Sequence, residues 1–194
     1  MGGVEKEMNL IIIGAQASGK MTIGQEIAEQ TGMTLFHNHD SIDFVLRFMP
    51  WSQESTALIE RLRFNFFETF AKNGQEMIFT IVIDFNDPND VAFLDKIQAV
   101  FQSYDQEVLF VELETDVNER LKRNRTENRL KHKPLKRNIE WSEQDIQSTM
   151  AYAVFNPEEP PKTLTHYQKI NNTQLTAAET AQLIIQKMTH IKEN

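Results

Sequence analysis

A glycine-rich stretch near the start of the chain has the residue types and spacing that phosphate binding needs. Residues 14–20 read Gly-Ala-Gln-Ala-Ser-Gly-Lys and fit the pattern G-x-x-x-x-G-K. In such a loop the backbone N–H groups point at an anion, and the lysine reaches the outer phosphates of a nucleotide. A glycine-rich turn before a helix would explain Gly14, but not Lys20 as the residue that enters the helix. We therefore expect a phosphate-binding loop formed by Gly14, Ala15, Gln16, Ala17, Ser18, Gly19 and Lys20.

The residues directly after the lysine bear on magnesium binding. The Ser or Thr whose hydroxyl usually ligates Mg²⁺ is replaced by Met21, and a hydroxyl comes one residue later, at Thr22. The sequence therefore leaves open whether any side chain binds the metal directly. We count Met21 and Thr22 among the nucleotide contacts and predict no metal-ligating residue.

Basic residues are concentrated in residues 118–137. This segment contains nine Lys or Arg residues and two Glu, whereas the whole chain has a net charge of -8. Such a segment is either a solvated helix face with a charged loop or a device that neutralises phosphate. Because the rest of the chain is acidic, we do not expect general binding of nucleic acid.

Carboxylates follow the predicted strands where a phosphoryl acceptor would lie. Transfer to a hydroxyl needs a nearby group that orients the hydroxyl and takes its proton. Asp84, after the apolar run 77–83, is our first candidate for this base, and Asp40 and Asp43 come next. Asp84 could instead cap a turn or helix, or bind a water of Mg²⁺.

Two histidines close to those aspartates are further candidates. His37 and His39 are separated by one residue and could contact the substrate. The same spacing also raises a zinc site, but the chain has no cysteine and no third ligand at a recognisable spacing. We therefore predict substrate binding for both histidines.

Apolar periodicity predicts the elements that must position these residues. Strands are expected at 8–13, 33–36, 77–83, 108–113 and 166–170. Helices are expected at 20–30, 55–72, 116–125, 142–155 and 176–190, and a further helix is expected to start at an N-cap formed by Asp90. Strands that alternate with helices predict a three-layer α/β fold, a five-stranded parallel sheet with helices on both faces. We also expect Trp141, Met150 and the aromatic residues of helix 55–72 in the core.

The composition is that of one globular domain covering residues 1–194. The chain has 40% hydrophobic and 25% charged residues, and its lack of cysteine excludes disulfides and thiol catalysis. The longest apolar runs are far shorter than the roughly 20 residues that cross a bilayer. Glu5, Lys6 and Glu7 do not fit a signal peptide. We therefore expect a cytoplasmic protein with no membrane partner, as a monomer or homodimer.

Taken together, the loop, the basic segment and the strand–loop–helix ending resemble the P-loop kinases of the nucleoside-monophosphate-kinase-like group, which includes adenylate, shikimate and gluconate kinases. Gly-Lys-Met-Thr at 19–22 is similar to the Gly-Lys-Gly-Thr of adenylate kinases, where Mg²⁺ is held largely by waters and phosphates. The resemblance spans nearly the whole chain in the order of elements. It implies the P-loop NTP hydrolase fold with a basic lid, Mg²⁺ as cofactor, and ATP and ADP as partners.

The resemblance also implies roles for the basic segment and for the segment near the end of the chain. A lid of about residues 120–140 would close over ATP, with Arg120 stacked on the adenine and with Arg123 and Arg125 clamping the transferring phosphate. Asn171, within Lys-Ile-Asn-Asn-Thr at 169–173, would lie beneath the adenine.

On the acceptor side the chain departs from shikimate kinases. The His-Asn-His sequence at 37–39 stands where they have Asp-x-Asp, Asp84 and its neighbours stand where they have three glycines, and only Arg63 matches. Shikimate is therefore not the expected substrate. A flap of about residues 37–56 is similar to an acceptor-binding segment, in which Phe44, Phe48 and Trp51 could wall a small pocket.

These observations favour an ATP-dependent phosphotransferase that acts on a small molecule or a nucleotide. Its acceptor, a hydroxyl or a phosphate, would be held by His37, His39, Asp40, Asp43 and Arg63. Two alternatives remain: a nucleotide-binding regulator or RNA-associated ATPase, and a P-loop domain that has lost catalysis.

Overall fold

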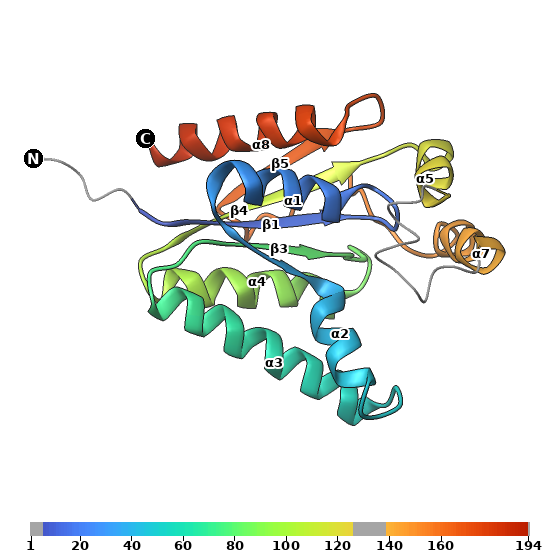
Figure 1. Cartoon of the computed structure of the whole chain (residues 1–194), viewed down its shortest axis with the longest axis horizontal. Coiled ribbons are helices and arrows are strands. Elements are labelled where there is room, and N and C mark those ends of the chain that lie inside the picture. The colour runs from blue at the N-terminus through green and yellow to red at the C-terminus, as the bar shows by residue number, and fades with distance from the viewer. Residues whose placement is uncertain (1–5, 126–138, 194) are drawn as a thin grey trace, which may run out of the picture.

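The chain folds around one twisted sheet of five strands (Figure 1). A computed structural model describes residues 6–125 and 139–193. The elements in chain order are β1 (Met8–Gly14), α1 (Lys20–Thr31), β2 (Thr34–His37), α2 (Asn38–Leu46), α3 (Gln53–Lys72), β3 (Met77–Ile81), α4 (Pro88–Gln102), β4 (Glu107–Glu114), α5 (Val117–Asn124), α7 (Ile139–Thr149), β5 (His166–Asn171) and α8 (Ala177–Lys192).

The sheet is parallel throughout, with the strand order β2-β3-β1-β4-β5. All seven residues of β1 are buried, as expected of a central strand covered on both faces. The chain order reverses beside β1, so that the carboxyl ends of β1 and β3 border a crevice where ligands bind in such sheets. The predicted parallel sheet with helices on both faces is confirmed.

Alternate residues of β1 face two separate cores. Leu10 and Ile12 pack with α1 and α8, whereas Ile11 and Ile13 pack with α3 and α4. Figure 1 shows the same layers, with α1 and α8 on one face of the sheet and α3 and α4 on the other. Since side chains of a strand alternate between faces, β1 is fixed from both sides and the loop after it starts from a rigid base.

Several predicted boundaries were wrong. The helix predicted after Asp90 is capped by Asp87, whose side chain accepts a hydrogen bond from the N–H of Asn89, with Pro88 at its first turn. The predicted flap contains a helix of its own, α2. A capping box between His37 and Asp40 marks the start of this helix. Helix α7 ends at Thr149, whereas we expected a helix that reaches residue 155.

Some residues predicted for the core lie at the surface. Trp141 is 51% exposed, Met150 is 48% exposed and Phe66 on α3 is 43% exposed, whereas Phe67 is fully buried. A helix buries only one stripe, so adjacent aromatic residues such as these two phenylalanines cannot both face the sheet. None of the described helices combines the length and the apolar character needed to span a membrane.

Candidate functional site

The glycine-rich loop joins β1 to α1 and is held closed by its own lysine. The Nζ of Lys20 donates hydrogen bonds to the carbonyl oxygens of Gly14 at 2.7 Å and Ala15 at 2.8 Å, and the lysine is only 8% exposed. Gly19 has φ 97°, a left-handed conformation that glycine adopts readily, and directly precedes α1. The loop therefore places a cation beside the N-terminus of a helix, where the helix dipole also favours an anion.

Close packing inside the loop explains its first glycine. A Cβ at Gly14 would lie 2.7 Å from the Oγ of Ser18 and 3.2 Å from the Cβ of Leu113 on β4. Ser18 is 1% exposed, and its Oγ has no hydrogen-bond partner among the described residues. Gly14 is therefore required by the close approach of the loop to its own serine and to β4.

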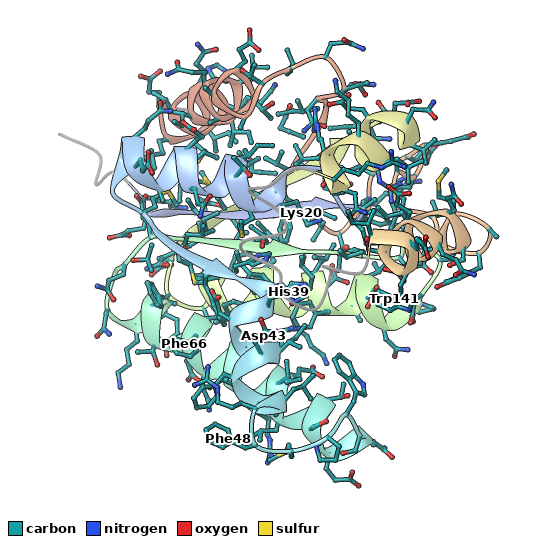
Figure 2. All side chains as sticks on the ribbon, turned by 45° about the vertical axis from the view of Figure 1, so that its right-hand side comes forward. Lys20, His39, Asp43, Phe48, Phe66 and Trp141 are labelled. Atoms are coloured by element: carbon teal, nitrogen blue, oxygen red, sulfur yellow. The ribbon has the colours of Figure 1, made fainter. Side chains whose placement is uncertain are left out.

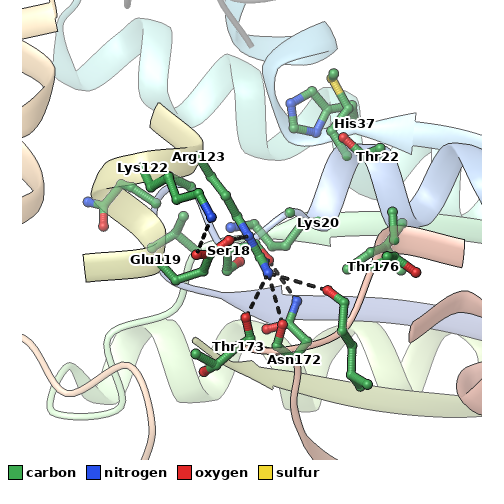
Figure 3. A pocket seen from close by; sticks show the side chains of 18 of the residues that line it. Ser18, Lys20, Thr22, His37, Glu119, Lys122, Arg123, Asn172, Thr173 and Thr176 are labelled. Atoms are coloured by element: carbon green, nitrogen blue, oxygen red, sulfur yellow. Dashed lines mark hydrogen bonds and ion pairs between the residues drawn. The ribbon is translucent and has the colours of Figure 1, made fainter. Parts of the chain in front are cut away.

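Arg123 on α5 ties this loop to the loop between β5 and α8. Its guanidinium donates to the carbonyl oxygens of Ser18 at 3.1 Å and Asn172 at 2.9 Å, and its Nε lies 2.9 Å from a carboxylate oxygen of Glu119 (Figure 3). Asn172 is 1% exposed and donates from Nδ2 to the same Ser18 carbonyl at 2.9 Å. Two side chains from distant parts of the sequence thus fix the carbonyl of Ser18.

A cavity of about 580 Å³ opens along the glycine-rich loop. Its walls come from the loop and the first turn of α1, from the ends of β2 and β3, from α5 and from the loop before α8. The lining residues are 16–23, 37–39, 81–82, 119, 122, 123 and 172–177. The predicted loop contacts Gln16 to Thr22 all line this cavity, and Gly14 and Ala15 contribute the carbonyls that hold Lys20.

A further part of the cavity wall is formed by the chain as it leaves β2. His37 is buried, its Nδ1 lies 2.5 Å from the Oγ1 of Thr80 on β3, and its ring centroid is 5.3 Å from that of His39. His39 lies in the first turn of α2, and its Nδ1 is 3.8 Å from Oδ1 of Asp43. The structure therefore brings both predicted histidines to the cavity that holds Lys20.

The other predicted acceptor residues support this wall without lining the cavity. Asp40 accepts a hydrogen bond from the backbone N–H of His37 at 2.8 Å, while partial burial raises the pKa of its carboxyl. The Nε of Arg63 donates to the Oγ of Ser41 at 2.9 Å, its Cζ lies 5.8 Å from the centre of the Phe79 ring, and burial lowers its pKa to about 10. Arg63 thus fastens α2 to α3.

Asp84 does not line the cavity, contrary to the base role expected for it. Its Oδ1 accepts hydrogen bonds from the backbone N–H groups of Asn86 at 3.0 Å and Val154 at 2.9 Å, and its own N–H donates to Asp90 at 2.8 Å. These contacts cap a turn and hold the segment after α7, which is the structural alternative considered for this residue. Ile81 and Val82 occupy the cavity wall at the end of β3 instead.

Two predicted arginines of the basic segment are also turned away. Arg120 is 4% exposed, donates to the backbone carbonyl of Gln16 at 2.8 Å and has its Cζ 5.7 Å from the centre of the Phe155 ring. Arg125 pairs with Glu143 on α7 at 2.6 Å and lies outside this cavity. Neither arginine lines the cavity, and Arg120 supports the loop through the carbonyl of Gln16.

The sequence predicted Asn171 as a nucleotide contact, but it is the neighbouring Asn172 that contacts the glycine-rich loop. Asn171 is exposed and bonds to Glu114 at 3.1 Å, whereas Asn172 reaches the glycine-rich loop. Strand alternation could have signalled this, because neighbouring residues at the end of β5 point to opposite sides. Lys122 and Glu119 were missed as well, although they follow Asp116 on one face of a short basic helix.

The remaining predictions near the site have mixed outcomes. Phe44, Phe48 and Trp51 are more than half exposed and do not line the cavity, so they do not wall a pocket here. Among residues 6–125 and 139–193, no group of three His, Asp or Glu side chains is placed to hold a metal ion. The predicted lid extends over residues 126–138, which lie outside the described part of the chain.

Solved structures with this fold include several kinases. A gluconokinase from Sinorhizobium meliloti has a TM-score of 0.63 and 14% identity, over 98% of this chain and 97% of that chain. The Mycobacterium tuberculosis APS kinase CysC in complex with AMPPNP and APS has a TM-score of 0.60 and 12% identity, over 96% and 99%. A shikimate kinase from Acinetobacter baumannii in complex with shikimate has a TM-score of 0.52 and 16% identity, over 98% and 97%.

No protein-family model and no curated protein matches the chain. The structural likeness confirms the expected P-loop kinase fold. At such low identity it shows the fold alone, so the chemistry has to be argued from the site.

Proposed function

We propose that the protein is a phosphotransferase that moves the γ-phosphate of ATP to a small-molecule acceptor. The observation that supports this most directly is one cavity lined both by the phosphate-binding loop, which we take as the donor end, and by His37 and His39, which we take as the acceptor end. A loop that only hydrolysed or stored a nucleotide would not need a second polar wall, formed by His37, Asn38 and His39 where the chain leaves β2. The two walls together suit a donor and an acceptor held side by side.

The residues at the donor end are arranged to neutralise phosphate. Lys20 is fixed on two carbonyl groups, so its ammonium stands at the N-terminus of α1 without losing further freedom when an anion binds. Lys122 and Arg123 line the same cavity from α5. Fixed cations in a site shielded from water stabilise the charge that develops on the transferring phosphoryl group.

The loop fits a magnesium ion that is held mainly by phosphates and water. Met21 lines the cavity where a hydroxyl ligand would follow the lysine, and Thr22 is the nearest hydroxyl of α1. When bound, Mg²⁺ would neutralise charge on the β- and γ-phosphate oxygens. The chain's own part is to orient those oxygens through Lys20 and the loop N–H groups.

The test is to incubate the protein with ATP labelled in its γ-phosphate, Mg²⁺ and an extract of small metabolites. We expect label in an organic product, and loss of that product with Lys20→Ala. A matched control is Lys72→Ala, which removes an exposed lysine from the last turn of α3. Thermal unfolding of all three proteins checks that the fold is retained.

Other fates of the label would contradict the proposal. Label that appears only as inorganic phosphate would favour an ATPase, and label that stays in ATP would favour a binding protein. Full transfer by Lys20→Ala would remove the loop from the reaction altogether.

A further inference from the structure

The acceptor end of the cavity has histidines where phosphotransferases commonly use a carboxylate. Among the described lining residues the carboxylate is Glu119, which lies on α5 at the donor end. Its Oε1 is 2.9 Å from the Nε of Arg123 and its Oε2 is 3.5 Å from the Nζ of Lys122. Both oxygens are thus committed to cations. Asp40, Asp43 and Asp84 do not line the cavity, and Asp84 accepts hydrogen bonds from the backbone N–H groups of Asn86 and Val154.

His39 has the position and the partner of a proton acceptor. It stands in the first turn of α2 and lines the cavity, and its side chain is 31% exposed. Its Nδ1 lies 3.8 Å from an Oδ1 of Asp43, one helical turn further along. Figure 2 shows both residues on the same helix, with Lys20 on the element above them. A carboxylate beside one ring nitrogen favours a proton on that nitrogen and leaves the other nitrogen, Nε2, able to accept one.

His37 is less suited to the same role. Its Nδ1 is engaged at 2.5 Å by the hydroxyl of Thr80, and the residue is 9% exposed between β2 and β3. Its backbone N–H is bound by Asp40. These contacts and its burial fix His37 as part of the wall, whereas the side chain of His39 is 31% exposed and also lines the cavity.

We propose that His39 is the general base that deprotonates an alcohol acceptor, and that Asp43 is the residue that positions it. This inference rests on the proposed phosphotransfer and names the acceptor class, a hydroxyl of a small molecule. A phosphate acceptor is already ionised at neutral pH and would need no base. Lys122 and Arg123 line the cavity from α5, whereas His39 lies on α2, so the wall around His39 suits an uncharged hydroxyl.

The step balances with the groups that are present. The acceptor O–H proton passes to Nε2 of His39 while the acceptor oxygen forms a bond to the γ-phosphorus. The bond between that phosphorus and the bridging oxygen breaks, and its electron pair leaves with ADP. The products are a phosphate monoester, ADP and an imidazolium, which returns its proton to water. Asp43 stabilises the imidazolium without taking the proton.

The charged groups around His39 define what its titration reports. On α2 and its cap these are Asp40, Asp43 and the imidazole of His37. Arg63 of α3 donates to Ser41 and to the carbonyl of Asn38, and Lys20 of α1 lines the same cavity. The carboxylate of Asp43 lies 3.8 Å from Nδ1 of His39, so replacing it should affect the titration of the ring.

The first experiment measures label transfer from ATP into the metabolite extract as a function of pH. For the wild-type protein we expect the rate to rise through the pH range in which an imidazole loses its proton. His39→Gln should lower the rate by about 10²-fold to 10⁴-fold and abolish that rise, with unchanged affinity for AMPPNP. Asp43→Asn should move the rise to lower pH. The matched control, His166→Gln, removes a histidine paired with Glu107 at the opposite end of the sheet. It should change neither the rate of label transfer nor its dependence on pH.

The second experiment reports on the pair without turnover. In ¹H–¹³C spectra of histidine-labelled protein, the His39 signal is the one absent from His39→Gln. We expect Asp43→Asn to move the midpoint of its chemical-shift titration to lower pH, because the imidazolium loses a neighbouring carboxylate. An unchanged midpoint would overturn the pairing.

The outcomes separate this inference from the proposed function. If the wild-type protein labels an alcohol and His39→Gln does so equally well with the same pH profile, the phosphotransfer stands and the base role is wrong. If label enters a phosphate group of the acceptor, the alcohol class is wrong. If the wild-type protein labels no organic product, the proposed function itself fails and the base role with it.

Discussion

The side-chain amide of Asn172 donates a hydrogen bond to the backbone carbonyl of Ser18 at 2.9 Å, across 154 positions of sequence. The Oδ1 of the same asparagine accepts from the Oγ1 of Thr115 at 2.5 Å. Arg123 donates to the same Ser18 carbonyl at 3.1 Å. The glycine-rich loop is therefore held by α5 and by the loops after β4 and β5, so that its N–H groups are oriented before any ligand arrives.

Replacing Asn172 should damage both the fold and nucleotide binding. Asn172→Ala leaves the buried hydroxyl of Thr115 and the carbonyl of Ser18 without this partner, so we expect unfolding free energy to fall by about 1–3 kcal/mol and AMPPNP affinity to drop. Chemical denaturation and calorimetric titration measure the two effects. Asn171→Ala, at the exposed neighbouring position, is the control, and equal losses in both variants would refute a specific role for Asn172.

The two arginines of α5 and its cap should differ in their effect on the nucleotide. Arg123→Lys keeps the charge but loses the planar fork that reaches Ser18 and Asn172, so we expect AMPPNP affinity to fall about tenfold. Arg125→Lys alters an exposed pair with Glu143 and should leave the affinity unchanged. Titration of both variants checks this, and a larger loss with Arg125→Lys would contradict the observed placement.

A methyl group at Gly14 should disrupt the loop through a clash with Ser18. Gly14→Ala would place Cβ 2.7 Å from the Ser18 Oγ, and overpacking of this kind costs about 1–3 kcal/mol of stability. The double variant Gly14→Ala, Ser18→Gly removes that oxygen and should recover part of the loss in both stability and AMPPNP binding. Strictly additive effects would show that the two positions are not coupled.

Acid should weaken a contact at the opposite end of the sheet. Glu107 lies 2.9 Å from Lys6 and 3.3 Å from His166, and its hydrogen bond with Lys6 lowers the pKa of its carboxyl. A lowered pKa in the folded state gives stability that is present above the unfolded value of 4.5 and is lost as the pH falls through the folded value. Glu107→Gln should therefore be less stable at pH 7, by under about 1 kcal/mol, and the difference should shrink below pH 4. Unfolding curves from pH 3 to 7 test this, and a difference that grows with acid would reverse the sign.

The chain's local patterns were sufficient for the sheet and for the loop. Buried runs such as 8–13 and 108–113 can be satisfied only inside a covered parallel sheet, and Gly14, Gly19 and Lys20 have a fixed spacing that defines a phosphate loop by itself. The signals are short-range, because the residues involved are neighbours in sequence. Boundaries were harder to predict, since Asp87 and Asp90 are both good caps, and the helix begins after Asp87 with Pro88 in its first turn.

Tertiary structure alone decided which polar residues meet in the cavity. Asp84 has the right type and strand position for a base, yet Asn86 and Val154 use its carboxylate, a contact that the sequence pattern does not reveal. Arg120 is buried against Gln16, and Asn172, rather than Asn171, reaches Ser18. Asn171 and Asn172 are the same residue type at the end of one strand, and they differ only in the direction of their side chains and in the distant residues that they contact. The sequence by itself determined the fold and the glycine-rich loop, whereas long-range packing determined which polar residues line the cavity beside that loop.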